Sequence, residues 1–157
     1  MSRPVIAHVL GVLAVLSGGC ATMVNETTQP IKVETLREGG TAVSGAECRL
    51  SNDYGSITMK SGDTAQVRRS GADLDIVCKD PANPDAVARL ISRANAGMLG
   101  NIILGGGIGA IIDHNKGTAY TYPTWVRLEF GRTLVFDRTH EKDGQPVAGR
   151  SPDTPAK

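Results

Sequence analysis

The stretch that decides the fold class, residues 46–78, reads AECRLSNDYGSITMKSGDTAQVRRSGADLDIVC. It contains short apolar runs, and turn-forming Gly, Asn, Asp or Ser residues close each of them. Short strands that recur about every 8–12 residues with such turns are typical of a small antiparallel sandwich or barrel. The runs lie at 46–50, 56–59, 65–68 and 74–78. We therefore expect a mainly β protein built on a small antiparallel β-sandwich or barrel-like domain.

Further strands are expected on both sides of this block. A run at 31–36 precedes it, with apolar residues on alternate positions at its start. Two strong β runs, at 124–130 and 133–136, follow it. Because a two-residue connection separates them, they are expected to form a hairpin. The β-rich domain is therefore expected to cover residues 30–138.

The segment 81–97 fits two structures. Its apolar residues at 87, 90, 91 and 94 recur with helical spacing, and Asn83 and Gly97 suit the two ends of a helix. The segment also follows the strand at 74–78 through a Pro/Asn/Asp turn, where a sandwich places its next strand. The residues of this segment leave helix and strand open.

The composition limits the class of protein. The chain has 157 residues, of which 40% are hydrophobic and 21% charged, and its formal net charge is +1. These values fit one globular domain and exclude a disordered polyampholyte, a collagen and a polytopic membrane protein. Because the charges are nearly balanced, no basic field indicates nucleic acid as a partner.

The N-terminus carries a targeting signal. Arg3 precedes a mostly apolar stretch at 5–16, and the small residues 17–19 stand directly before Cys20. The apolar stretch is shorter than the roughly 20 residues that cross a bilayer core. The pattern resembles the signal of bacterial lipoproteins. Ordinary secretion with cleavage elsewhere, and an uncleaved anchor, are the alternatives.

The resemblance to a lipoprotein signal has consequences for the mature chain. It implies that residues 1–19 are removed and that the Cys20 sulfur carries diacylglycerol, with further palmitate-type acylation. Residues 20–29 then form a polar tether. Ala21, where an Asp would favour retention in the inner membrane, favours the periplasmic face of the outer membrane. The membrane is thus the expected partner, through the N-terminal lipid.

The other two cysteines form an even pair. With Cys20 assigned to lipid, Cys48 and Cys78 remain, both in strand-like runs. In an oxidising compartment they are expected to form a disulfide, with two reduced buried thiols as the alternative. Such a bridge over about 30 residues contributes roughly 3–4 kcal/mol. No Cys or His stands near them at metal-ligand spacing, so we expect no metal site.

A glycine-rich apolar segment interrupts the β pattern. Residues 97–112 read GMLGNIILGGGIGAII. In a helix, the glycines at 105, 106, 107 and 109 alone cost about 4 kcal/mol relative to alanine. The segment is therefore expected either to pack closely through its small residues as a helix or to break into a hairpin. Packing over the domain and contact with the membrane or with another copy are the alternatives.

The glycine-rich segment also belongs to a longer motif, N-x3-GGGIG-x3-D-x3-G-x-AY-x-YP. This motif resembles one found in small bacterial envelope lipoproteins, in which a β-rich domain loosely similar to PEGA-type modules precedes it. The resemblance implies a strand at 86–92. It implies a packing role for the motif residues, with no chemistry attached. The motif residues are Asn101, Gly105, Gly106, Gly107, Gly109, Asp113, Gly117, Tyr120, Tyr122 and Pro123.

No catalytic pattern is visible in the sequence. His114 is the one histidine of the expected domain, and its neighbour Asp113 does not face it as a catalytic partner would. The nucleophile-elbow, zinc-protease and phosphate-loop motifs are absent. A literal dinucleotide-type match at 105–110 lacks the βαβ context that such a site requires. We expect a protein that is not an enzyme and that has no cofactor.

The last residues, 139–157, contain Val147 as their single large apolar residue and are expected to be a disordered tail. The sequence as a whole indicates a non-enzymatic envelope lipoprotein, a membrane-tethered structural or interaction module that contacts itself or another envelope protein. One alternative is a membrane-perturbing or oligomeric pore-type component that uses 97–112. The other is a periplasmic binding module.

Overall fold

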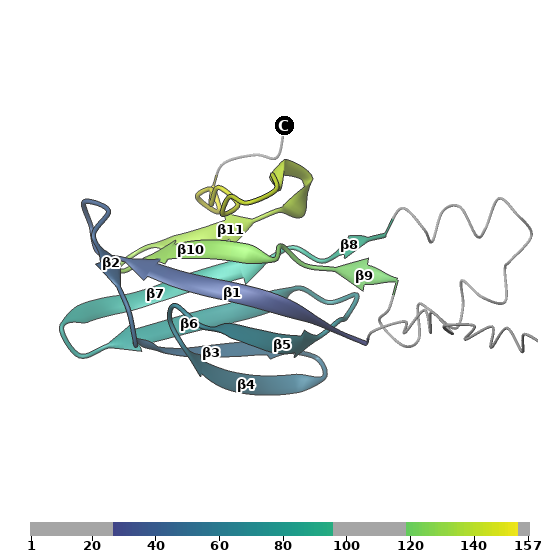
Figure 1. Ribbon diagram of the computed structural model, residues 1–157, viewed down its shortest axis with the longest axis horizontal. Helices are drawn as coiled ribbons and strands as arrows, with labels where there is room; N and C mark the ends of the chain where they lie inside the picture. Colours follow the sequence, from purple (N-terminus) through teal and green to yellow (C-terminus); the bar gives the residue numbers. More distant parts are fainter. Residues whose placement is uncertain (1–26, 96–118, 154–157) are drawn as a thin grey trace, which may run out of the picture.

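The computed structural model describes residues 27–95 and 119–153 (Figure 1). Within these two ranges the regular structure is made of β-strands, apart from one short 3-10 turn, η1 (Arg138–His140). The expectation of a mainly β protein is therefore confirmed. In the described part of the chain, no helix is long and apolar enough to cross a membrane.

The first sheet is built around β1 (Thr28–Leu36). This strand pairs in parallel with β10 (Trp125–Glu129) along one side. On its other side it pairs antiparallel with β5 (Thr64–Arg68) near its start and with β2 (Ala42–Val43) near its end. The longest strand of the domain thus joins elements from both ends of the chain.

The second sheet has the order β11-β7-β6-β3-β4. The pairings β7–β6, β6–β3 and β3–β4 are antiparallel, whereas β11 lies parallel to β7. A separate short pair, β8 (Arg93–Ala94) and β9 (Tyr120–Thr121), projects from one end of the domain (Figure 1). The strands of the second sheet are β11 (Thr133–Phe136), β7 (Asn83–Leu90), β6 (Leu74–Asp80), β3 (Glu47–Asn52) and β4 (Gly55–Lys60).

Both sheets contain parallel as well as antiparallel strand pairs, so the expectation of an antiparallel domain is wrong. The predicted hairpin between 124–130 and 133–136 is also wrong. The two runs do form strands, β10 and β11, but they belong to different sheets. Gly131, with a φ of +79°, carries the chain across, and its amide donates to the Asp85 carbonyl at 3.2 Å. The Val87 amide then binds the Arg132 carbonyl at 3.0 Å, which starts β11 beside β7.

The segment left open between helix and strand is a strand as far as Leu90. Along β7 the buried residues Ala86, Ala88 and Leu90 alternate with more exposed ones. This period of two matches a sheet with one covered face. The strand expected at 86–92 is thus confirmed over 86–90, and the chain leaves the sheet at Ile91, before β8.

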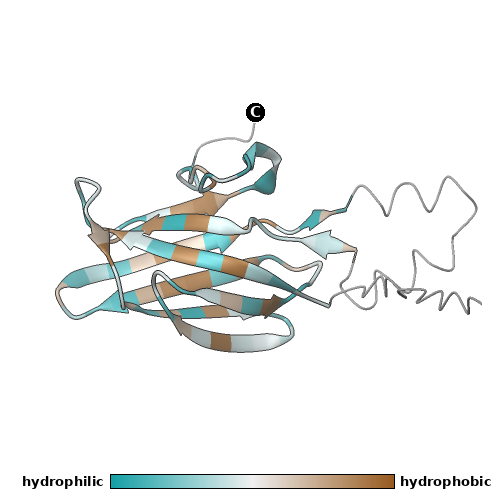
Figure 2. Ribbon diagram, in the orientation of Figure 1, coloured by the Kyte–Doolittle hydropathy of each residue, from teal (hydrophilic) through white to brown (hydrophobic). Residues whose placement is uncertain are grey.

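The two sheets share one hydrophobic core. Apolar and polar residues alternate along the strands (Figure 2), and the apolar side chains of both sheets belong to a single buried cluster. The first sheet contributes Ile31, Val33, Val126 and Leu128, and the second Leu50, Ile76, Leu90, Leu134 and Phe136, among others.

The expected disulfide between Cys48 and Cys78 is present. The two residues lie directly opposite each other on β3 and β6, with their Cα atoms 4.0 Å apart, and both are fully buried. The chain between them includes β5, which belongs to the first sheet. The bridge therefore closes a loop that passes through both sheets.

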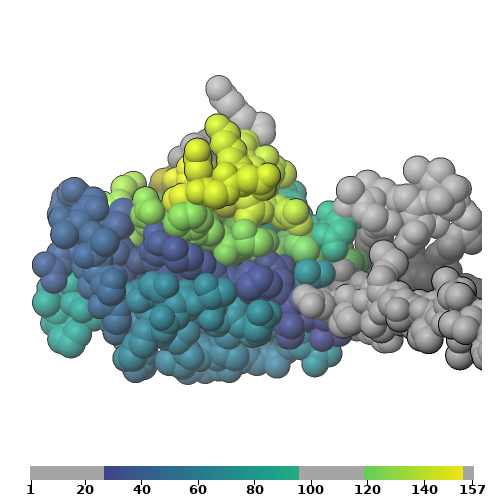
Figure 3. Space-filling view, in the orientation of Figure 1, coloured from purple at the N-terminus to yellow at the C-terminus, as the bar shows by residue number. Residues whose placement is uncertain are grey.

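The C-terminal segment is ordered, so the expectation of a disordered tail over 139–157 is wrong for its described part. Val147 is 3% exposed and donates its amide to the Trp125 carbonyl at 2.9 Å. Arg150 exchanges two backbone hydrogen bonds with Val135, at 2.8 and 2.9 Å. These bonds need no apolar side chains, because every non-proline residue offers the same backbone groups. The segment covers the domain next to β10 and β11 (Figure 3), so the domain extends beyond residue 138.

Several expectations fall outside the described residues. These are the signal at 1–19, the lipidated Cys20, the glycine-rich segment 97–112 and its motif residues Asn101, Gly105, Gly106, Gly107, Gly109, Asp113 and Gly117.

Candidate functional site

The chain enters the domain at the same end from which β8 and β9 project (Figure 1). Thr27 accepts a hydrogen bond from the Arg69 amide at 2.8 Å, beside the β1–β5 pairing. Asn95 donates its amide to the Ala119 carbonyl at 2.7 Å, so the residues that flank 96–118 are held together. We call this end, defined by Thr27, Asn95 and Ala119, the tether pole.

Tyr122, a residue of the predicted motif, is fully buried at the tether pole. Its phenol donates to the Ala72 carbonyl at 2.8 Å and accepts from the Asn52 side-chain amide at 3.2 Å. Burial raises the pKa of this phenol above its ordinary value. The neutral Tyr122 phenol therefore links the segment after β9 to the end of β3 and to the loop before β6.

β1 begins at Thr28, so the tether expected over 20–29 is shorter than predicted. Gln29, the second residue of β1, binds the backbone of Tyr122. Its side-chain amide donates to the Tyr122 carbonyl at 3.0 Å and accepts from the Tyr122 amide at 3.0 Å. Gln29 is 2% exposed, so both bonds lie inside the protein. The start of β1 and the end of the motif are thus joined as two paired strands would be.

The other two described motif residues also have packing roles. Tyr120 lies on β9, and its ring covers Gly71: a Cβ atom built there would stand 3.3 Å from two ring carbons. Pro123 is fully buried and leads into Thr124, whose carbonyl accepts the Lys32 amide at 2.8 Å. Both residues thus pack against neighbouring segments of the domain.

A serine and aspartate cluster lies next to Tyr122. The Ser70 hydroxyl donates to the Asp53 carboxylate and accepts the Ala72 amide at 3.0 Å. The Ser92 hydroxyl donates to the Ser70 carbonyl at 2.6 Å, and the Ser92 amide to Asp73 at 2.9 Å. These bonds connect the loop before β6 to the chain that leaves β7.

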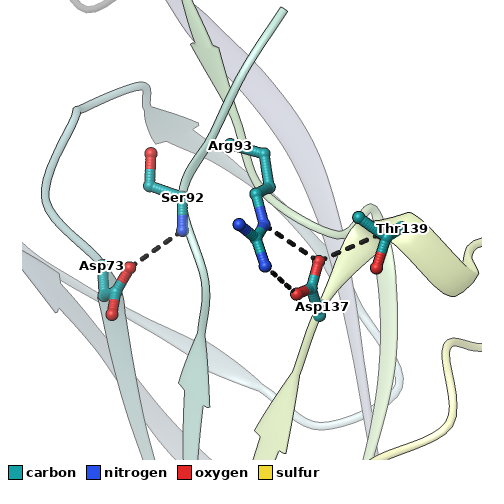
Figure 4. A network of polar contacts seen from close by, with 5 residues as sticks. All are labelled: Asp73, Ser92, Arg93, Asp137 and Thr139. Carbon is teal, nitrogen blue, oxygen red and sulfur yellow. Dashed lines mark hydrogen bonds and ion pairs between the residues drawn. The ribbon is translucent and has the colours of Figure 1, made fainter. Parts of the chain in front are cut away.

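Arg93 and Asp137 form the ion pair at the base of β8 (Figure 4). The Arg93 guanidinium donates through two nitrogens, with Nε 3.2 Å from Oδ1, and the Thr139 amide donates to Oδ1 at 3.1 Å. The Asp137 side chain is 8% exposed. The Arg93 guanidinium, together with the Thr139 amide, lowers the pKa of Asp137 from 3.8 to about 2. Asp137 is therefore ionised at neutral pH and holds β8 against the end of β11.

The arrangement at the tether pole connects chain segments; its polar groups bind one another. Sequence reasoning identified Tyr120, Tyr122 and Pro123 as motif members. It missed the partners Gln29, Ser70, Ser92, Arg93 and Asp137, because each meets its partner through folding and no local pattern marks it. Among residues 27–95 and 119–153, no group of three or more His, Cys, Asp or Glu side chains is placed to hold a metal ion.

A second feature lies at the opposite end of the domain, where the turns after β1, β6 and β10 meet (Figure 1). It is an open groove of about 590 Å³. Arg132 in its wall pairs with Glu129 at 2.7 Å. The lining residues are Arg37, Glu38, Asn83, Pro84, Glu129, Phe130, Gly131 and Arg132. The groove contains both acidic and basic residues, so it favours neither anionic nor cationic ligands.

The chain matches no protein-family model, no curated protein and no solved structure.

Proposed function

We propose that this protein is a non-enzymatic envelope lipoprotein whose sandwich-like β domain is an interaction module held at a membrane by acyl chains on Cys20. The observation that carries the proposal is the tether pole. Thr27, which follows the tether, and Asn95 and Ala119, which flank the glycine-rich segment, lie at one end of the domain. The lipid and the apolar segment 97–112 would then act from the same end.

The length of the tether supports this arrangement. Residues 20–26 separate the lipidated position from Thr27. At about 3.3–3.6 Å per extended residue they reach roughly 25 Å. Thr27 would then lie within one bilayer thickness of the membrane surface. Two or three acyl chains, at about 0.8 kcal/mol per buried methylene, hold such a module stably. The periplasmic face of the outer membrane remains the proposed location.

The polar network of the tether pole gives the module a firm base. Gln29, Tyr122 and the Arg93–Asp137 pair fix the three chain segments that lead toward Cys20 and 97–112. A load on the tether would therefore be passed to both sheets. The resemblance of the motif to those of small envelope lipoproteins, with their PEGA-like β domains, supports the same class of function.

Two other functions have a specific feature in their favour. The groove of about 590 Å³ at the far end would serve a periplasmic binding module. The location at the tether pole of Asn95 and Ala119, which flank 96–118, would serve a membrane-perturbing component or a pore-type assembly that uses 97–112. For neither function do the described residues include a side chain with a specific chemical role. We therefore place the tethered interaction module first.

Metabolic labelling with an alkyne fatty acid tests the proposal. Full-length protein should be labelled and should remain in the membrane fraction after a high-salt wash. Cys20→Ala should lose the label and change its fractionation or maturation, whereas Cys48→Ser, the matched cysteine control, should keep the label. An unlabelled wild-type protein, or equal labelling of Cys20→Ala, would contradict lipidation at Cys20.

A further inference from the structure

The outer edge of β4 is open in the described part of the chain. β4 ends the second sheet and pairs with β3 along one side over six residues. The strand at the other end of this sheet, β11, is bound by Arg150, and β10 of the first sheet by Val147. β4 lies at the lower rim of the domain in Figure 1. The C-terminal segment thus binds along β10 and β11 and does not cover the edge of β4.

The direction of the free backbone groups follows from one hydrogen bond. The Ser61 amide donates to the Ala46 carbonyl at 2.8 Å, in the same register as the β3–β4 ladder. Because antiparallel strands alternate their bonding direction residue by residue, Met59 and Ile57 face β3. The amides and carbonyls of Ser56 and Thr58, and the amide of Lys60, therefore point to the open side, whereas the Lys60 carbonyl accepts the Asp63 amide at 3.2 Å in the turn to β5.

Two large apolar side chains are exposed at or next to this edge. In the described residues, the exposed large hydrophobic side chains are Tyr54, at 41%, and Ile57, at 37%, and both lie here. A hollow of about 120 Å³ beside Ile57 is lined by the core residues Leu50, Val67 and Leu74 and also by polar residues that include Asn52 and Arg68. Positions 55–59 contain no charge and no proline, the usual protections of an edge strand.

We propose that β4 is a self-association edge, through which two copies of this chain pair antiparallel about a two-fold axis at Ile57. The outward-pointing groups allow this register: Ser56 of one copy lies opposite Thr58 of the other. Ile57 then lies opposite Ile57, in the closely spaced type of pair. The exposed isoleucines cover each other beside the two hollows. An isologous interface of this kind closes with two copies.

The charges of the strand favour the antiparallel arrangement. Lys60 is the one charged residue of β4. Antiparallel pairing places it opposite Tyr54 of the second copy, whose ring centre lies 4.0 Å from the Arg68 guanidinium of the same copy. The two lysines then stand about 20 Å apart, at roughly 3.3 Å per residue. Parallel pairing would set them side by side.

The pairing goes beyond the proposed tethering. It sets the two copies side by side and in opposite directions, so that their tether poles lie at opposite ends of the dimer. Since each tether reaches roughly 25 Å, both ends contact one bilayer when the dimer lies along its surface. Self-association would hold equally for a chain without lipid, so its test is separate from the test of lipidation.

Cysteine crosslinking of the full-length chain in cells tests the proposed axis. Ile57→Cys should give a disulfide-linked dimer on a non-reducing gel, with peptide mapping that joins position 57 of both copies. Gln66→Cys, an exposed position on β5, is the matched control and should stay at the background of the parent chain. Equal crosslinking at both positions, or a bridge from position 57 to a different protein, would overturn the proposal.

A backbone variant provides a second, independent test. Thr58→Pro removes an outward amide and leaves the bonds to β3 in place, so the domain should keep its Cys48–Cys78 bridge and its unfolding midpoint. Its dimer, measured by sedimentation in detergent, should weaken at least about tenfold, because two symmetric hydrogen bonds are lost. Thr58→Val keeps the amide and should dimerise as the wild type does. A monomeric wild type, or an unchanged Thr58→Pro dimer, would overturn the proposal.

Discussion

The side-chain amide of Gln29 makes two hydrogen bonds, both 3.0 Å long, with the backbone of Tyr122, 93 residues further along the chain. The Gln29 side chain thus binds the Tyr122 backbone in the way that a neighbouring strand would. Since both residues are almost completely buried, neither group can turn to water instead. This contact makes the tether pole one unit, because it joins the segment after the tether to the segment after 96–118.

Replacing Gln29 should therefore destabilise the domain strongly. Gln29→Leu is similar in size but leaves the Tyr122 amide and carbonyl buried without a partner. We expect a loss of about 2–4 kcal/mol in the free energy of unfolding, measured by urea denaturation. Gln66→Leu, on the exposed face of β5, is the control and should change stability little. A Gln29→Leu loss no larger than that of the control would contradict the role given to this contact.

The Arg93–Asp137 pair should make stability depend on pH in the acid range. The pKa of Asp137 is lowered from 3.8 to about 2 in the folded protein, so its stabilising effect is present above pH 4 and disappears as the pH falls through 2. Asp137→Asn should cost about 1–2 kcal/mol at pH 7 and little near pH 2.

Urea midpoints at several pH values measure this difference. Asp75→Asn is the control, because Asp75 and its partner Arg89 are both more than half exposed and such pairs contribute little. If the two variants behave alike between pH 7 and pH 2, the buried pair does not stabilise the pole.

The disulfide should contribute through the unfolded state. Cys48→Ser should lower stability by roughly 3 kcal/mol, because a bridge with a sequence separation of 30 restricts the unfolded chain. Cys78→Ser should give the same loss, and the double variant should add little to it. On a gel, the wild type should shift on reduction and both variants should not. Additive losses in the double variant would show that side-chain packing dominates over the bridge.

The C-terminal segment should be part of the folded domain. A Cβ atom at Gly149 would stand 2.9 Å from two Phe136 ring carbons and 3.1 Å from a Leu134 methyl carbon. Gly149→Ala should therefore cost about 1–3 kcal/mol, the usual range for overpacking. Ala148→Ser, at the exposed neighbouring position, is the matched control. Slow amide exchange at Val147 and Arg150 should accompany the wild-type structure, and exchange at the rate of an unfolded chain would contradict it.

Sequence reasoning was reliable where the information is local. The strands of 46–78 and of 31–36 follow from alternating apolar residues and from turn-forming residues, and each lies within a few positions of its prediction. The Cys48–Cys78 pairing followed from the count of cysteines and from the expectation of an oxidising compartment. Tyr122 and Pro123 were identified by a motif, without any knowledge of their partners.

Other features depended on contacts that no local pattern records. The turn at Gly131 fits a hairpin as well as a crossover, and the neighbouring strands β1 and β7 decide between them. The segment around Val147 has the composition of a disordered tail, yet its backbone binds β10 and β11.

The amino-acid sequence by itself thus determined the strands in 31–36, 46–78, 124–130 and 133–136, because apolar runs and the turn-forming residues that close them are local features. The tertiary structure alone decided which sheet each strand joins, what the last segment covers and how Gln29 meets Tyr122. Backbone hydrogen bonds are the same for almost every residue, so their partners are selected when the two sheets pack into one core.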